Sequence, residues 1–217
     1  MRGVESRSLV GIDRETSRRN FLKTAAFTGA ALSAAGITGF GVAVRRAHAV
    51  HEGYQEVGDV AILQFAYLLE QLEGTFYDIG VDSGLFRSTF LDQIAAIRDH
   101  EFAHIDAIAT TLGDLGEDVP AVPEFTYPDS AFASAAGFLE LAATFEPVGI
   151  GAYQGAAPAL VNKDILAAAI SIHNAECQHR CAINIMNLIV PPNDLAFEEA
   201  LPLADVQAAV EPFGITG

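Results

Sequence analysis

The chain has 217 residues, of which 12 are lysine or arginine and 28 are aspartate or glutamate, so its formal net charge at pH 7 is −16. So acidic a surface excludes nucleic acid and anionic lipid as binding partners, because like charges repel. The two cysteines, Cys177 and Cys181, cannot build a disulfide framework, and we interpret them as small packing residues.

Residues 1–49 are predicted to be a signal peptide. A paired-arginine segment, "SRRNFLK" at 17–23, precedes twenty uncharged residues at 25–44 that are mostly alanine, glycine, serine and threonine. Two arginines and "AHA" at 47–49 follow, and the latter has the small-x-small pattern of a cleavage site. The segment resembles a twin-arginine export signal. A permanent membrane anchor is the alternative, since twenty residues can span a bilayer, but so much glycine and alanine favours cleavage.

The resemblance to a twin-arginine signal implies the twin-arginine export machinery as a partner and an extracellular or cell-envelope location. Proteins exported this way typically cross the membrane already folded, often with a cofactor loaded inside the cell. Cleavage after Ala49 would leave a domain at 50–217 with four basic and 25 acidic residues, a formal net charge of −21. This charge favours adaptation to high salt, where counterions screen repulsion; an ordinary acidic secreted protein is the alternative.

Four segments of the 50–217 domain show helical periodicity, and none alternates like a strand. They cover about 57–80, 88–112, 130–160 and 164–189. The first two are joined by the short "GVDSG" and the last two by "LVNKD", whereas the long "GDLGEDVPAVPEFTYPDS" separates the pairs. Short, long and short connections predict an all-α four-helix bundle made of two antiparallel hairpins and a crossover. The segment "PLADVQAAVEPF" predicts a short C-terminal helix.

The fourth helical segment carries two polar residues on the face that should be packed with aliphatic side chains. In "SIHNAECQHR" at 171–180, Glu176 and His179 are three residues apart and therefore project from one face of the helix. Glu101 and His104 repeat the pattern on the second helix, in "DHEFAHIDAIA". Because an unpaired buried carboxylate costs several kcal/mol or becomes neutral, something in the core must compensate these residues.

The remaining two helices complete an internal duplication. Glu70 precedes Tyr77 by seven residues, as Glu146 precedes Tyr153, and Glu70 lies 31 residues before the first Glu-x-x-His glutamate while Glu146 lies 30 before the second. Four carboxylates neutralise two divalent cations, and oxygen and imidazole donors favour iron or manganese. The candidate metal ligands are Glu70, Glu101, His104, Glu146, Glu176 and His179.

Residues beside these six have two interpretations each. Tyr77 and Tyr153 either hydrogen-bond to a ligand or bridging oxygen, or are core tyrosines with satisfied hydroxyls, which we favour. Glu73 is either a supplementary ligand or a charge at the rim, and its equivalent in the second half is a glycine. His100 and His173 lie beside the face of the site, and we expect each at its rim or in contact with a ligand rather than among the direct ligands.

The chain resembles the exported ferritin-like domain family, which includes desiccation-related proteins. The resemblance covers about 57–213 and rests on "ILQFAYLLEQLEGTFY", "DHEFAHIDAI", "FEPVGIGAYQGAAPAL" and "AISIHNAECQHR". It implies a ferritin-like four-helix bundle with a di-metal centre and carries metal-binding roles onto the six candidate ligands. Pro147 directly follows Glu146. A proline disfavours helical geometry at the residue before it, so we expect a kink in the third helix at Glu146.

Three functions remain open at this point. We favour a di-iron or di-manganese centre that carries out metal-dependent oxidation or peroxide removal in stress protection, with dioxygen or peroxide as the reactant. The alternatives are a non-catalytic envelope or desiccation-stress protein, and Fe(II) oxidation with iron storage, which needs a symmetric homo-oligomer. The sequence does not decide whether the protein is an enzyme or which oligomer it forms.

Overall fold

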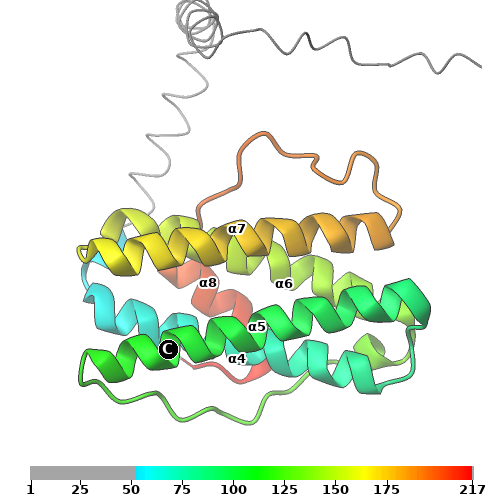
Figure 1. The fold of residues 1–217 in the computed structure, drawn as a ribbon, viewed down its shortest axis with the longest axis horizontal. Coiled ribbons are helices and arrows are strands. Elements are labelled where there is room, and N and C mark those ends of the chain that lie inside the picture. Colours follow the sequence, from blue (N-terminus) through cyan, green and yellow to red (C-terminus); the bar gives the residue numbers. More distant parts are fainter. Residues whose placement is uncertain (1–51, 217) are drawn as a thin grey trace, which may run out of the picture. The chain divides into compact units, whose positions relative to one another are not determined.

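The computed structural model describes residues 52–216, which form an all-α fold built on four long helices (Figure 1). The predicted signal peptide at 1–49 lies outside the described residues, so export stays a prediction. No helix within 52–216 combines the length and the hydrophobicity that a membrane crossing needs. The long helices are α4 (Gly58–Asp82), α5 (Ser88–Asp114), α6 (Ala135–Ala156) and α7 (Lys163–Met186). The short elements are α3 (Glu52–Gln55), η1 (Asp129–Phe132), η2 (Ala157–Ala159), α8 (Leu203–Val210) and η3 (Glu211–Phe213).

The four long helices form the expected bundle of two hairpins. α4 packs along α5 and α6 along α7, and the hairpins meet where α4 contacts α6 and α5 contacts α7 (Figure 1). The crossover from α5 to α6 therefore joins helices at opposite corners of the bundle, which explains its length. Tyr127 ties this crossover to the bundle by donating a hydrogen bond to the Leu72 carbonyl over 2.7 Å. The short C-terminal helix is also present, as α8.

The third helix is shorter at both ends than its periodicity predicts, and the fourth ends three residues before its predicted end. Ser134 accepts a hydrogen bond from the Gly137 amide over 3.1 Å and starts α6, five residues after the predicted beginning. Asn162 caps α7 in the same way. Pro147 lies inside α6 without ending the helix. Its ring is exposed, so the carbonyl that it leaves unpaired is on the side where water can bond to it.

The buried apolar residues form two clusters along the bundle axis. One contains Phe76, Phe138 and Ile97, and the other contains Ile62 and Ile108. On α5 and α7 the buried glutamate, Glu101 or Glu176, lies in the sequence between residues of one cluster and residues of the other. The bundle therefore has a polar layer between two apolar halves, and the apolar halves hold the helices that supply the polar side chains.

Candidate metal centre

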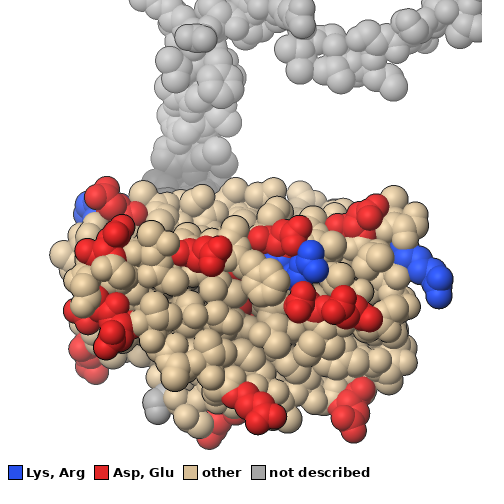
Figure 2. All heavy atoms as spheres, turned by 60° about the horizontal axis from the view of Figure 1, so that its bottom comes forward, with Lys and Arg blue, Asp and Glu red and all other residues tan. Residues whose placement is uncertain are grey.

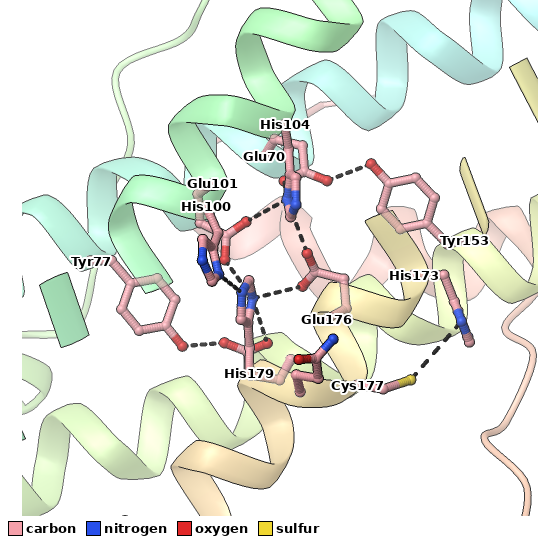
Figure 3. A network of polar contacts seen from close by, with 12 residues as sticks. Glu70, Tyr77, His100, Glu101, His104, Tyr153, His173, Glu176, Cys177 and His179 are labelled. Atoms are coloured by element: carbon pink, nitrogen blue, oxygen red, sulfur yellow. Dashed lines mark hydrogen bonds and ion pairs between the residues drawn. The ribbon is translucent and has the colours of Figure 1, made fainter. Parts of the chain in front are cut away.

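Each of the four long helices contributes one glutamate to the polar layer. Glu70 on α4, Glu101 on α5, Glu146 on α6 and Glu176 on α7 are at most 1% exposed. The two histidines of the repeated motif join them, with side-chain exposures of 12% for His104 and 3% for His179. All six candidate ligands therefore converge within one region of the bundle, which Figure 3 shows from close by.

The first group of potential ligand atoms surrounds His104. Its Nδ1 atom lies 3.1 Å from Glu70 Oε2, 3.2 Å from Glu101 Oε2 and 3.3 Å from Glu176 Oε1. One ligand atom from each of these four residues lies within 4.8 Å of the others, which is close enough for a single ion to contact them all. This group offers three carboxylate oxygens and one imidazole nitrogen.

The second group surrounds His179. Its Nδ1 atom lies 2.9 Å from Glu101 Oε1, 3.8 Å from Glu146 Oε2 and 3.7 Å from Glu176 Oε2. Glu101 and Glu176 therefore each direct one carboxylate oxygen toward His104 and the other toward His179. A carboxylate that divides its two oxygens between two ligand groups is placed to bridge two ions. Each copy of the repeated Glu-x-x-His motif therefore contributes one imidazole and one carboxylate to the groups that could hold metal ions.

Several of these buried atoms have no hydrogen-bond partner. Within the described residues, they are Glu101 Oε1, Glu146 Oε2, both carboxylate oxygens of Glu176 and His179 Nδ1. The 2.9 Å approach of His179 Nδ1 to Glu101 Oε1 is not aligned as a hydrogen bond. Unpaired buried acceptors are rare in proteins because they are costly. Cations would satisfy these acceptors, so the residues fit a pair of metal ions.

The two tyrosines connect α4 and α6 by a crossed pair of hydrogen bonds. Tyr77 on α4 donates to Glu146 on α6, and Tyr153 on α6 donates to Glu70 on α4 (Figure 3). Burial, reinforced by the neighbouring carboxylates, raises the pKa of both phenols well above the ordinary value, so both stay protonated donors. Their hydroxyls are satisfied by candidate ligands, which is the first of the two interpretations left open by the sequence.

Glu73 also points into the polar layer, although the duplication does not require it. It is only 5% exposed, and the space for its carboxylate is made by Gly149 on α6. A Cβ atom on Gly149 would stand 3.2 Å from Glu73 Oε1 and 3.5 Å from Glu176 Oε2. The interpretation of Glu73 as a rim charge is therefore wrong, because its carboxylate is enclosed beside that of Glu176.

The histidines beside the site differ in their roles. His100 is exposed, yet its Nδ1 lies 2.9 Å from His179 Nε2 and the two rings stack at 5.2 Å. A hydrogen on His179 Nε2 donated to His100 leaves His179 Nδ1 free to bind an ion, and such outer contacts orient metal ligands. His173 instead contacts Gln154 Oε1 over 3.0 Å. Sequence reasoning placed His100 beside the ligands but did not identify its partner, because that contact depends on the packing of α5 against α7.

The pKa values of the cluster show how unfavourable its charges are without cations. Burial raises the pKa of Glu70 to about 8 and the pKa of Glu146 well above its usual range, and neighbouring carboxylates add to both effects. Burial acts in the same direction on Glu101, but the two neighbouring imidazoles, His104 and His179, outweigh it and lower its pKa to about 2. The same carboxylates outweigh the burial of the imidazoles and raise the pKa to about 12 for His104 and about 11 for His179.

The surface around this layer is strongly acidic. Figure 2 shows acidic side chains spread over one face of the described part, with few lysines or arginines among them. Cys177 and Cys181 are both free and half-buried, and neither belongs to a candidate ligand group.

A four-helix bundle with a buried layer of glutamates and histidines that could hold metal ions defines the class of protein. Residues 58–187 match the ferritin-like domain family. Because this match covers more than half of the chain, the protein belongs to that family. No curated protein matches the chain.

Proposed function

We propose that the protein binds two divalent metal ions, iron or manganese, in the glutamate–histidine layer and uses them for oxidation by dioxygen or for removal of peroxide. One observation carries this proposal: Glu101 and Glu176 each divide their oxygens between two ligand groups, and the buried acceptors have no other partner among the described residues. Burial raises the pKa of Glu73 well above its ordinary value, so this carboxyl stays protonated. The four other carboxylates and two divalent cations would then give a neutral site, which removes most of the cost of burial.

A pair of divalent ions that each release one electron can reduce dioxygen with two protons to hydrogen peroxide, or hydrogen peroxide with two protons to two waters. The residues of the chain hold the geometry for this chemistry. Glu70 and Glu146 would each hold an ion through a carboxylate oxygen, and a tyrosine from the opposite hairpin donates a hydrogen bond to each of these glutamates. His100 orients His179 and connects it to the exposed surface of α5.

Metal analysis of the purified protein is the direct test, followed by single-turnover reactions of the reduced centre with dioxygen and with hydrogen peroxide. Two ions per chain and oxidation by either reactant are expected. Glu176→Ala should lower the metal content below two, whereas Glu140→Ala, which removes an exposed glutamate of α6, should leave it unchanged. A purified protein that takes up no iron or manganese under any loading condition would contradict the proposal.

Two further parts of the proposal rest on the sequence. The paired-arginine segment and its "AHA" site support export by the twin-arginine route, and the resemblance to desiccation-related proteins supports a role in stress protection in the cell envelope or outside the cell. Replacing Arg18 and Arg19 by lysine should retain the protein inside the cell, as measured by fractionation. Export of this variant at the normal level would contradict the proposed route.

A further inference from the structure

An apolar cavity lies next to the glutamate–histidine layer, at the end of the bundle opposite the phenylalanine cluster. Its volume is about 60 Å³, and all four long helices contribute to its wall. The wall consists almost entirely of aliphatic and aromatic carbon, including Ile62 on α4, Ile108 on α5 and Ile165 on α7. Tyr153 forms part of this wall, and its hydroxyl donates to Glu70. The cavity therefore ends one hydrogen bond away from a candidate metal ligand.

The few hydroxyls in the wall give water little to bind. Tyr153 already donates to Glu70, and Thr111 donates to the Ala107 carbonyl over 2.8 Å. Tyr54 has a buried hydroxyl without a partner among the described residues. A buried water needs two to four polar partners, and a cavity that cannot offer them stays dry and takes up apolar guests. The wall thus favours an uncharged guest with no hydrogen-bond donors.

The exposed residues Ala107 on α5 and Ala168 on α7 also line this cavity, so it borders the surface between these helices. A second pocket adjoins the cavity. Its volume is about 190 Å³, and it is lined by Gln154, His173 and Ile170. Tyr153 and Ala169 line both pockets, so these two side chains form a wall that the pockets share. In Figure 3, Tyr153 and His173 lie on the same side of the ligand cluster, opposite Tyr77.

We propose that the inner cavity binds dioxygen and delivers it to the glutamate–histidine layer past Tyr153. This inference rests on the proposed metal-centred function and names its oxidant. The space holds a molecule of a few atoms and excludes a large organic substrate. Hydrogen peroxide would enter such a wall with its donors and acceptors unpaired, which is unfavourable, whereas dioxygen has no donor to satisfy. Peroxide would instead approach through the polar, exposed side of the cluster at His100.

Xenon is the probe for the cavity itself, because it occupies dry apolar cavities and needs no metal. Crystals of the metal-free protein exposed to xenon should show a xenon peak in the space bounded by Ile62, Ile108 and Tyr153. Ala169→Phe should remove the peak by filling the shared wall. Ala167→Phe is the matched control, because it places the same side chain at an exposed position of α7 and should retain the peak.

The reaction with dioxygen is the second measurement. In stopped-flow single turnovers of the reduced, metal-loaded protein, Ala169→Phe should slow oxidation by dioxygen about tenfold, because a filled cavity leaves no room for the guest. Oxidation by hydrogen peroxide should remain within about twofold of the rate for Ala167→Phe. Should Ala169→Phe fail to fold, Ala66→Leu in the α4 wall makes the same test.

Three results would overturn the inference. They are the absence of xenon from the wild-type cavity, an unchanged dioxygen rate in Ala169→Phe, and equal slowing with dioxygen and peroxide, which would indicate a disturbed ligand cluster. A protein that binds xenon but no metal ion would disprove the proposed function and, with it, the delivery of dioxygen. That outcome is distinguishable, because the xenon measurement is made on the metal-free protein.

Discussion

Tyr153 on α6 donates its phenolic hydrogen to Glu70 on α4, a residue of the other hairpin. Tyr77 and Glu146 form the reciprocal bond between the same two helices. The crossed pair shows that α4 and α6 run antiparallel, because the later residue of one helix meets the earlier residue of the other. Two hydrogen bonds thus fasten the hairpins to each other and aim one carboxylate from each of them at the site.

Replacing either tyrosine by phenylalanine tests this relationship. Tyr153→Phe and Tyr77→Phe should each lower the affinity for Mn(II) or Fe(II) about tenfold, because partners of metal ligands hold them in place. In the metal-free protein, each substitution should lower the free energy of unfolding by about 1–3 kcal/mol, since a buried carboxylate loses its donor. Chelator competition and urea denaturation measure the two effects. Tyr67→Phe, on α4 but outside the cluster, serves as the control for the metal affinity. Metal affinities equal to that of the wild type would contradict the role of the tyrosines.

A pair of glycine substitutions tests the enclosed position of Glu73. Gly149→Ala places a Cβ atom 3.2 Å from Glu73 Oε1, so the carboxylate must move, and we expect a loss of metal affinity of about tenfold. Gly113→Ala on α5 is the matched control, because nothing lies within 4 Å of its added Cβ. That control should raise the free energy of unfolding by about 0.5–1 kcal/mol and leave metal binding unchanged. Equal metal affinities in the two variants would show that the Glu73 carboxylate can move away from the added Cβ atom without disturbing the site.

The stability of the metal-free protein should fall as the pH rises. Glu70, with its pKa raised to about 8, binds its proton more tightly in the folded state, so its contribution is lost as the pH rises from the ordinary carboxyl range through 8. The contributions of His104 and His179 are complete below the ordinary histidine pKa and are lost as the pH rises toward about 12 and about 11. Glu101 acts oppositely, because its contribution is lost only as the pH falls toward about 2.

Chemical denaturation at about pH 5, 7 and 9, with a chelator present, measures this dependence. Saturating Mn(II) should weaken or reverse the slope, because ions bind the deprotonated ligands. A variant that lacks both histidines, His104→Leu with His179→Leu, should lose part of the slope at the alkaline end. Stability that rises with pH in the chelated wild-type protein would be inconsistent with the charge balance of the layer.

Salt should stabilise the protein through its surface charge. The segment at 50–217 contains four basic and 25 acidic residues, so folded molecules experience strong self-repulsion. Raising KCl from about 0.1 M to about 1 M shortens the screening length from about 10 Å to about 3 Å. We expect the melting temperature to rise by about 5 °C, which calorimetry can measure. A melting temperature that is flat or falls over this range would contradict adaptation to high salt.

The sequence by itself determined the class of fold, the two hairpins and the six residues that share the core faces. These features depend on helical periodicity and on the lengths of connections, both of which are local properties of the chain. The sequence also predicted metal binding. Carboxylates and imidazoles recur on helix faces that are otherwise apolar, and buried negative charges there need cations to neutralise them. The helix ends were less accurate, since they depend on single capping side chains such as Ser134.

Only the tertiary structure decided which residues meet. Tyr77 lies seven residues after Glu70, which is about 10 Å along the helix axis, so each tyrosine reaches a glutamate of another helix rather than its own. The enclosure of Glu73 depends on the missing side chain of Gly149, 76 residues later, and His100 contacts His179 from outside the core face. Such contacts arise from the offset and rotation of packed helices, and no spacing along one helix encodes them.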